Sequence, residues 1–333
     1  MDEKFLKEIE MMAKSIREDQ ELEESSEPSL KSLYEAVLLQ RRRTEQKIRQ
    51  LTQAARERDS FCADIQKIRA EHHMAEKIQR SLLPGDFQKC MEAFPVEIYA
   101  DMDTAWEVGG DYYDFFGIDD RYFFFCIADV SGKSVSAAMF SVIVKTIVGI
   151  YIAEGKDIAQ VCEEVSRQLY QKQNGGSHMF VTLWAGVLDT VTGQIEYVNA
   201  GHDAPVLIRK NGELEMLEEN SGLPLAAYFN KKRPEKSKYK KHQIDLHEGD
   251  MLFLYTDGLT DSENREGVRF GSEKVMNALE RCEAAQRSVR EYVQYLQRTI
   301  VTYASHNHRE DDITVLGIRY LGGMEGQKDV QGE

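Results

Sequence analysis

Three apolar segments of strand length, far apart in this sequence, each carry an aspartate at one end. A carboxylate at the end of a buried strand is costly to desolvate unless a positive charge meets it. The strands and their aspartates are Tyr122–Ala128 with Asp129, Met251–Tyr255 with Asp257, and Ile313–Tyr320 with Asp311. Each aspartate alone would usually be read as a turn residue or a helix cap. Three of them in equivalent positions predict instead that the strand ends meet at one site.

Asp111 adds a fourth carboxylate to this pattern. It follows Gly109 and Gly110, which allow a tight backbone turn, and no Arg or Lys lies within five residues of it. Lys133 is the nearest cation in sequence to Asp129. Carboxylates, carbonyls and waters are the ligands that magnesium and manganese prefer. The sequence therefore predicts a cluster that holds a hard divalent cation, and metal-assisted hydrolysis is the chemistry it favours.

Composition and charge narrow the class of protein. Residues 1–90 carry 17 Lys and Arg against 18 Asp and Glu, so nearly all of the net charge of −15 lies in residues 91–333. So acidic a domain is a poor partner for nucleic acid or anionic lipid. The five cysteines have no C-x-x-C spacing, which argues against zinc and disulfides. The N-terminus has no signal peptide, and no uninterrupted apolar run approaches the ~18 residues of a membrane span. We expect a cytoplasmic protein.

The N-terminal quarter of the chain is predicted to be helical. Residues 1–28 form an acidic helical segment that breaks at Ser25–Pro28, and residues 29–91 form a long helix and linker. Apolar residues recur at three- and four-residue spacing along this helix, which favours a parallel dimeric coiled coil over a single solvated helix. The predicted seam is weak, because it contains alanine, cysteine and a nearby Arg58. We expect a homodimer and regulation through the helix.

Residues 92–321 are predicted to form an α+β domain, and residues 322–333 a disordered tail. Only turns separate the expected strands 179–188, 194–199 and 205–208, which indicates an antiparallel meander. Helices are expected both between and after the strands, so we expect them to pack on the sheets. The expected strands are 96–100, 122–130, 179–188, 194–199, 205–208, 251–255 and 313–320. The expected helices are 134–154, 157–173, 272–281 and 284–304.

Six motifs occur in an order that resembles the SpoIIE/RsbU-type bacterial serine phosphatases, which belong to the metal-dependent protein phosphatase (PPM, type 2C) superfamily. They include W-E-V-G-G-D-Y-Y-D, I-A-D-V-S-G-K, Y-V-N-A-G-H-D-A-P, L-Y-T-D-G-L-T-D and D-D-I-T-V-L, and the likeness spans about residues 74–320. The resemblance implies an α-β-β-α sandwich of two antiparallel sheets flanked by helices. It also implies a centre of two Mn²⁺ or Mg²⁺ ions at one end of the sandwich.

The resemblance assigns roles by position. Asp111, Asp129, Asp257 and Asp311 match the metal-binding carboxylates, Asp129 as the bridging one, and the backbone carbonyl of Val130 matches a main-chain ligand. Asp312 is expected to orient its neighbour. Asn199, Gly201 and His202 match a further motif, for which we favour a turn held by side-chain hydrogen bonds. Two serines, Ser134 and Ser136, stand where the family usually has Gly and Pro, and Ser134 is expected to cap the next helix.

The resemblance also implies a phosphorylated protein substrate, such as a STAS-type anti-sigma-factor antagonist, and an upstream regulator. Two other functions stay open from the residues alone. The chain could be a coiled-coil signalling adaptor with a weakly active phosphatase domain, or a small-molecule phosphatase. The segment Lys231–His242 carries seven Lys and Arg within the acidic domain. We favour a solvated loop for it over a docking patch for an acidic protein.

Overall fold

The computed structural model describes residues 7, 10, 14, 28–172, 179–227, 238–283, 287–304 and 311–323. The chain divides at residue 71 into two units. The first unit contains most of a 55-residue helix, α2 (Pro28–Leu82), and the last turns of this helix belong to the second unit. Helix α2 ends at Leu82, directly before the sequence Leu83-Pro84-Gly85. The predicted acidic segment 1–28 and the tail 322–333 lie almost wholly outside the described residues, and the predicted domain boundary at residue 91 stays a prediction.

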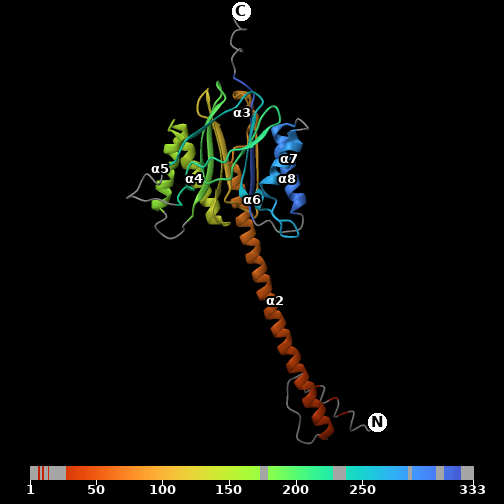
Figure 1. Cartoon of the computed structure of the whole chain (residues 1–333). Coiled ribbons are helices and arrows are strands. Elements are labelled where there is room, and N and C mark those ends of the chain that lie inside the picture. The colour runs from red at the N-terminus through yellow and green to blue at the C-terminus, as the bar shows by residue number, and fades with distance from the viewer. Residues whose placement is uncertain are drawn as a thin grey trace, which may run out of the picture. The chain divides into compact units, whose positions relative to one another are not determined.

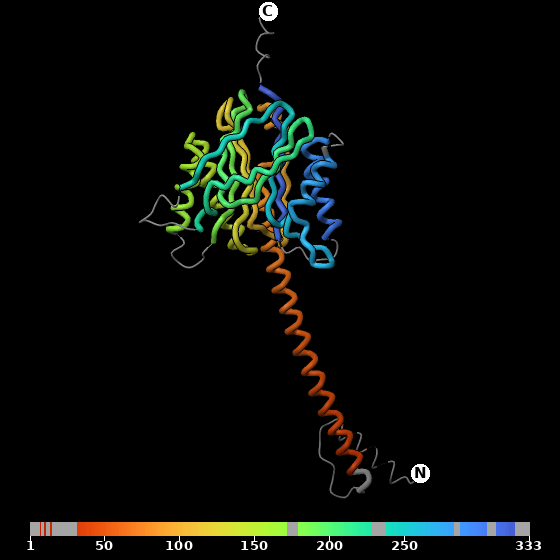
Figure 2. Tube along the Cα trace, viewed as in Figure 1, coloured from red at the N-terminus to blue at the C-terminus, as the bar shows by residue number. Residues whose placement is uncertain are grey.

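The second unit contains two five-stranded antiparallel sheets, as predicted. The first sheet has the order β1-β10-β9-β6-β7, and the second has the order β2-β3-β4-β5-β8. Figure 1 shows the sheets stacked between two helical layers, and Figure 2 shows that β1 and β10, from opposite ends of the unit's sequence, run side by side. The strands of the first sheet are β1 (Val96–Asp103), β6 (Val206–Ile208), β7 (Leu214–Met216), β9 (Met251–Tyr255) and β10 (Ile313–Tyr320). Those of the second are β2 (Tyr112–Gly117), β3 (Tyr122–Val130), β4 (Val181–Asp189), β5 (Gln194–Ala200) and β8 (His242–Asp245).

Helices cover the outer face of each sheet. On the second sheet lie α4 (Val135–Ala153) and α5 (Ile158–Lys172), and on the first lie α7 (Gly271–Glu283) and α8 (Val289–Tyr303). The short helix α6 (Asp257–Asp261) follows β9, and α3 (Phe87–Ala93) precedes β1. Five elements were not predicted from the sequence, and all of them are short and lack clear periodicity: α3, α6, β2, β7 and β8. The architecture is therefore the predicted α-β-β-α sandwich.

Strand β3 explains why its apolar run has no alternation. Phe123, Phe125 and Ile127 point into the core between the two sheets. Phe124 and Cys126 point outward and pack under α4 and α5. A strand that is buried on both faces needs apolar residues at every position, so the run is continuous until the strand reaches the edge of the sandwich.

Helix α4 corrects one prediction. The sequence predicted no apolar run near the length of a membrane span, yet this 19-residue helix is long and apolar enough to cross a membrane by length and composition alone. A third of its most apolar window is buried in the structure. The sequence prediction counted uninterrupted apolar residues, and Lys145 interrupts this helix. In the structure Lys145 forms an ion pair with the buried Asp114 of β2, at 2.9 Å between Nζ and Oδ2. The buried side of α4 packs on β2 and β3, as that of a core helix does.

Candidate metal centre

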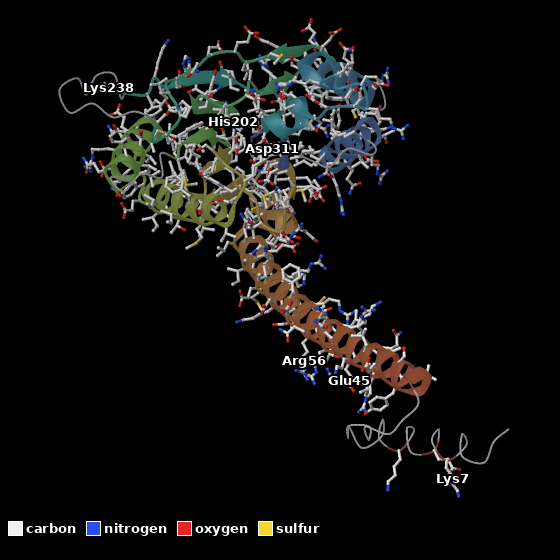
Figure 3. All side chains as sticks on the ribbon, turned by 90° about the horizontal axis from the view of Figure 1, so that it is seen from below. Lys7, Glu45, Arg56, His202, Lys238 and Asp311 are labelled. Atoms are coloured by element: carbon white, nitrogen blue, oxygen red, sulfur yellow. The ribbon has the colours of Figure 1, made fainter. Side chains whose placement is uncertain are left out.

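The register of the strands brings the predicted carboxylates to one end of the sandwich. In the second sheet, Tyr112 pairs with Ala128, so Asp111 and Asp129 extend this pairing by one residue. In the first sheet, Val315 pairs with Tyr255, so Asp257 and Asp311 flank the same end of the β9–β10 pair. Each sheet thus contributes two carboxylates, and the structure brings together all four aspartates that the sequence singled out. Figure 3 shows Asp311 and His202 toward the middle of the unit.

Asp111 is the buried member of this group and is bonded across the two sheets. Its side chain is 1% exposed. The hydroxyls of Thr256 and Thr314 donate to its Oδ2 at 2.8 and 2.7 Å. Thr314 lies in β10 and Thr256 directly follows β9, so both hydrogen bonds come from the first sheet. The hydroxyl of Thr256 also accepts from the backbone N–H of Thr314 at 3.0 Å. The sequence analysis missed both threonines, although each stands within three residues of a predicted ligand.

The carboxylates raise one another's pKa. Burial, and then the charges of Asp129 and Asp312, raises the pKa of Asp111 well above its usual range. Burial, and then the charges of Asp257 and Asp311, raises the pKa of Asp129 to about 7. Burial also raises the pKa of Asp257, and Asp311 adds to this effect. So much unbalanced negative charge is stable only if protons or cations neutralise it.

The side chain of Asp312 holds the backbone of the Asp111 loop, and the role expected for it, orienting its neighbour Asp311, stays a prediction. The two carboxylate oxygens of Asp312 accept from the backbone N–H groups of Ala105 at 2.8 Å and Gly110 at 2.7 Å. A side chain at Gly110 would approach the carbonyl oxygen of Val130 to 2.7 Å, so the glycine lets that carbonyl lie against the loop. The Val130 carbonyl therefore borders the cluster, where a main-chain ligand is expected.

The end of α2 also contacts this loop through a buried glutamine. The Nε2 of Gln79 donates to the carbonyl of Gly109 at 2.6 Å, and its Oε1 accepts from the N–H of the same residue at 3.1 Å. Gln79 is 7% exposed. The sequence analysis missed this residue, because nothing in the helix pattern separates one glutamine from the others. The last turns of α2 are thus hydrogen-bonded two residues before Asp111.

One lysine lies at the edge of the cluster. Lys133, the nearest cation in sequence to Asp129, forms an ion pair with Asp311 at 3.0 Å between Nζ and Oδ2. Its charge also lowers the pKa of Asp257, against the effects of burial and of neighbouring acids. In the described part of the chain, no three acidic, histidine or cysteine side chains meet closely enough to enclose an ion as they stand. The donors are nevertheless all oxygen atoms, which fits a hard divalent cation and not zinc held by sulfur or nitrogen.

The second predicted motif forms a turn next to the cluster, as expected. The backbone N–H of His202 donates to Oδ1 of Asn199 at 2.8 Å, and Gly201 has a φ of 69°. Burial lowers the pKa of His202 to about 4, so the ring is neutral near pH 7. Asp203, which the sequence analysis did not single out, faces Asp257. Burial, and then the charges of Asp257 and Asp261, raises its pKa to about 6.

The structure contradicts one expectation about the flanking loops and leaves a second largely untested. Ser134 occupies the N-cap of α4, but its side chain makes no capping hydrogen bond. The basic segment is described only from Lys238 on, at the periphery of the unit (Figure 3). Within it, Lys241 forms ion pairs with Asp157 and Glu196 at 2.7 and 2.8 Å. At least this lysine is therefore engaged inside the domain and not offered to a partner.

Comparison with known structures gives the class of fold. The SiaA-PP2C domain of Pseudomonas aeruginosa superposes with a TM-score of 0.66 at 20% identity, over 78% of this chain and 99% of that one. The PP2C phosphatase domain and regulatory fragment of SpoIIE from Bacillus subtilis superposes with a TM-score of 0.56 at 16% identity, over 67% and 62% of the two chains. The fold is that of the PP2C phosphatases.

The family model for stage II sporulation protein E (SpoIIE) matches residues 119–321. The chain belongs to the SpoIIE family, as its motifs suggested. It is 26% identical to the phosphoserine phosphatase RsbU of Bacillus subtilis, over 76% of this chain and 71% of that protein. It is 25% identical to protein IcfG of Synechocystis sp., over 75% of this chain but 41% of that protein.

Proposed function

We propose that this chain is a metal-dependent phosphoserine/phosphothreonine protein phosphatase. The observation that carries the proposal is the meeting of Asp111, Asp129, Asp257 and Asp311 at one end of a PP2C sandwich, with their charges largely unbalanced. The relationship to RsbU, which is named a phosphoserine phosphatase, supports the class of substrate.

The four aspartates and the Val130 carbonyl are the groups that would hold two Mn²⁺ or Mg²⁺ ions. Bound ions would supply Lewis-acid activation of water and neutralise charge on a transferring phosphoryl group. The protein's own contribution is positional: Thr256, Thr314 and Asp312 fix the Asp111 loop by hydrogen bonds. Preorganised ligands of this kind lower the cost of reaching the reactive geometry.

The regulatory setting is proposed from the resemblance and from the helix. We infer a phosphorylated regulatory protein as substrate, such as a STAS-type anti-sigma-factor antagonist, and an upstream regulator that acts through α2 in a homodimer. Exposed apolar side chains along α2, among them Ile48, Leu51 and Ile68, are consistent with a partner helix. A cytoplasmic location stays a prediction of the sequence.

The proposal is tested by assaying the full chain on p-nitrophenyl phosphate, a phosphoserine peptide and free nucleotides, with and without manganese. Manganese-dependent release of phosphate from the peptide is the expected result. Activity confined to nucleotides would favour a small-molecule phosphatase, and no activity on any substrate would favour a signalling adaptor. Asp120→Asn, an exposed aspartate in the β2–β3 turn, provides a matched control for substitutions in the cluster.

A further inference from the structure

The loop between β3 and α4 places one exposed lysine at the edge of the carboxylate cluster. The Nζ of Lys133 lies 3.0 Å from Oδ2 of Asp311, and the two side chains are 43% and 35% exposed. An ion pair so open to water contributes little to the stability of the fold. Stabilising the fold therefore does not explain this ion pair well. The pair joins a basic side chain to a carboxylate that we assign to metal binding, so a role at the site is the alternative.

The backbone of this loop is fixed at its base and open at its tip. The N–H of Ser131 donates to the carbonyl of Phe180, and the hydroxyl of Ser131 accepts from the N–H of Phe180, both at 2.9 Å. Gly132 has a φ of 103°, and a Cβ added there would meet no atom within 4 Å. The loop thus has an anchored base and open space beside Gly132, so the long side chain of Lys133 can change partners without moving the strand.

The charges around Lys133 identify a second partner for it. Substrate phosphate is anionic, and the described side chains that neighbour Asp129 and Asp257 are mainly carboxylates, which repel an anion. A lysine ammonium is a common point-charge ligand for phosphate. If a divalent cation takes the oxygens of Asp311, Lys133 loses its partner while it still stands beside the site.

We propose that Lys133 binds the phosphoryl group of the substrate, and that its ion pair with Asp311 is the resting arrangement that metal binding releases. This inference rests on the proposed function. The Lys133 ammonium first competes with the cation for Asp311 and then contacts the phosphate oxygens. Metal binding and phosphate binding are measured separately, so either role can be refuted without the other.

The first readout is binding of Mn²⁺ to the full chain, measured by titration calorimetry without substrate. Lys133→Gln removes the competing ammonium, so its affinity for Mn²⁺ should equal or exceed that of the wild type. Lys210→Gln is the matched control. Lys210 also forms an exposed ion pair, with 3.6 Å between its Nζ and Oε1 of Glu248, but this pair does not belong to the cluster. Weaker Mn²⁺ binding by Lys133→Gln alone would overturn the proposal, since the lysine would then be supporting the ligand set.

The second readout is inhibition by inorganic phosphate, measured with p-nitrophenyl phosphate at saturating Mn²⁺. Loss of one charge-assisted hydrogen bond should raise both the inhibition constant for phosphate and KM about 10- to 100-fold in Lys133→Gln. Lys133→Arg, which keeps the charge, should stay within a few-fold of the wild type. An unchanged inhibition constant in Lys133→Gln would overturn phosphate binding. A wild-type chain that neither binds Mn²⁺ nor hydrolyses the ester would instead refute the proposed function itself, and this inference with it.

Discussion

Replacing Gln79 by leucine would test whether the end of α2 sets the geometry of the metal centre. The substitution keeps the approximate size of the side chain but removes both hydrogen bonds to Gly109. The N–H and the carbonyl of Gly109 would then be buried without partners. Each such group costs about 1–3 kcal/mol, so leaving both in place would cost about 2–6 kcal/mol.

The loop can avoid much of that cost by moving Gly109 toward water. Because Gly109 lies two residues before Asp111, such a movement displaces a ligand whose other contacts are to the opposite sheet. If only 1.4 kcal/mol of the cost is transferred to metal binding, the affinity for Mn²⁺ falls about tenfold. We therefore expect Gln79→Leu to weaken Mn²⁺ binding at least about tenfold and to lower turnover at subsaturating manganese.

The assay combines titration calorimetry with Mn²⁺ and unfolding in urea of the metal-free chain. Gln88→Leu is the control, because Gln88 bonds only to Glu92 on the exposed face of α3 among the contacts described for it. If Gln79→Leu lowers the free energy of unfolding but leaves Mn²⁺ affinity and turnover unchanged, the glutamine stabilises the fold without positioning Asp111. That result would refute the reasoning.

Three further predictions concern the cluster and the helix. Asp129→Asn is nearly isosteric and should reduce manganese-dependent turnover by orders of magnitude while the chain stays folded; near-normal turnover at saturating manganese would contradict the assignment. Because the folded pKa of Asp129 is raised to about 7, the metal-free protein should lose stability as pH rises from about 4 to 7, and melting curves in a chelator should show a smaller loss for Asp129→Asn. Because the pKa of folded His202 is lowered to about 4, His202 makes the protein more stable as pH rises from about 4 to 6.5. This contribution is the same in the wild type and in Asp129→Asn, so it cancels when the two melting curves are compared. Ile48→Asp combined with Leu51→Asp should dissociate the proposed dimer in sedimentation and alter activity; a wild-type monomer at micromolar concentration would rule out the dimer, and unaltered kinetics of a dissociated mutant would rule out the coupling.

The carboxylates could be predicted from the sequence because each stands at the end of a strand. Strands of one sandwich end at common edges, so an aspartate near the end of β3 and another just after β9 are brought together by the fold alone. The continuous apolar run of β3 also predicted a buried strand, and the structure shows that both of its faces are buried. These inferences need only local patterns and the layered architecture, and both are visible in one sequence.

The supporting residues could not be predicted in the same way. Thr256 and Thr314 bond to Asp111 across 145 and 203 residues of sequence, and Gln79 reaches Gly109 from a helix whose other glutamines look alike. The ion pair of Lys133 with Asp311 was also not predicted, because the two residues are far apart in sequence. Such partners depend on side-chain geometry between distant segments, which no spacing rule encodes.

The two threonine hydroxyls matter for judging which relatives of this chain keep a working site. A sequence can retain every aspartate and still carry valine at the positions of Thr256 and Thr314. Valine has nearly the shape of threonine, so the packing between the sheets would survive, but the buried Asp111 would lose both of its hydroxyl donors. The ionised form of Asp111 would then be even less stable relative to its protonated form. A comparison that counts only the acidic residues would still describe the site as intact. Serine at the same positions would keep the donors, so we expect these two neutral residues to distinguish active relatives from inactive ones that keep all four aspartates.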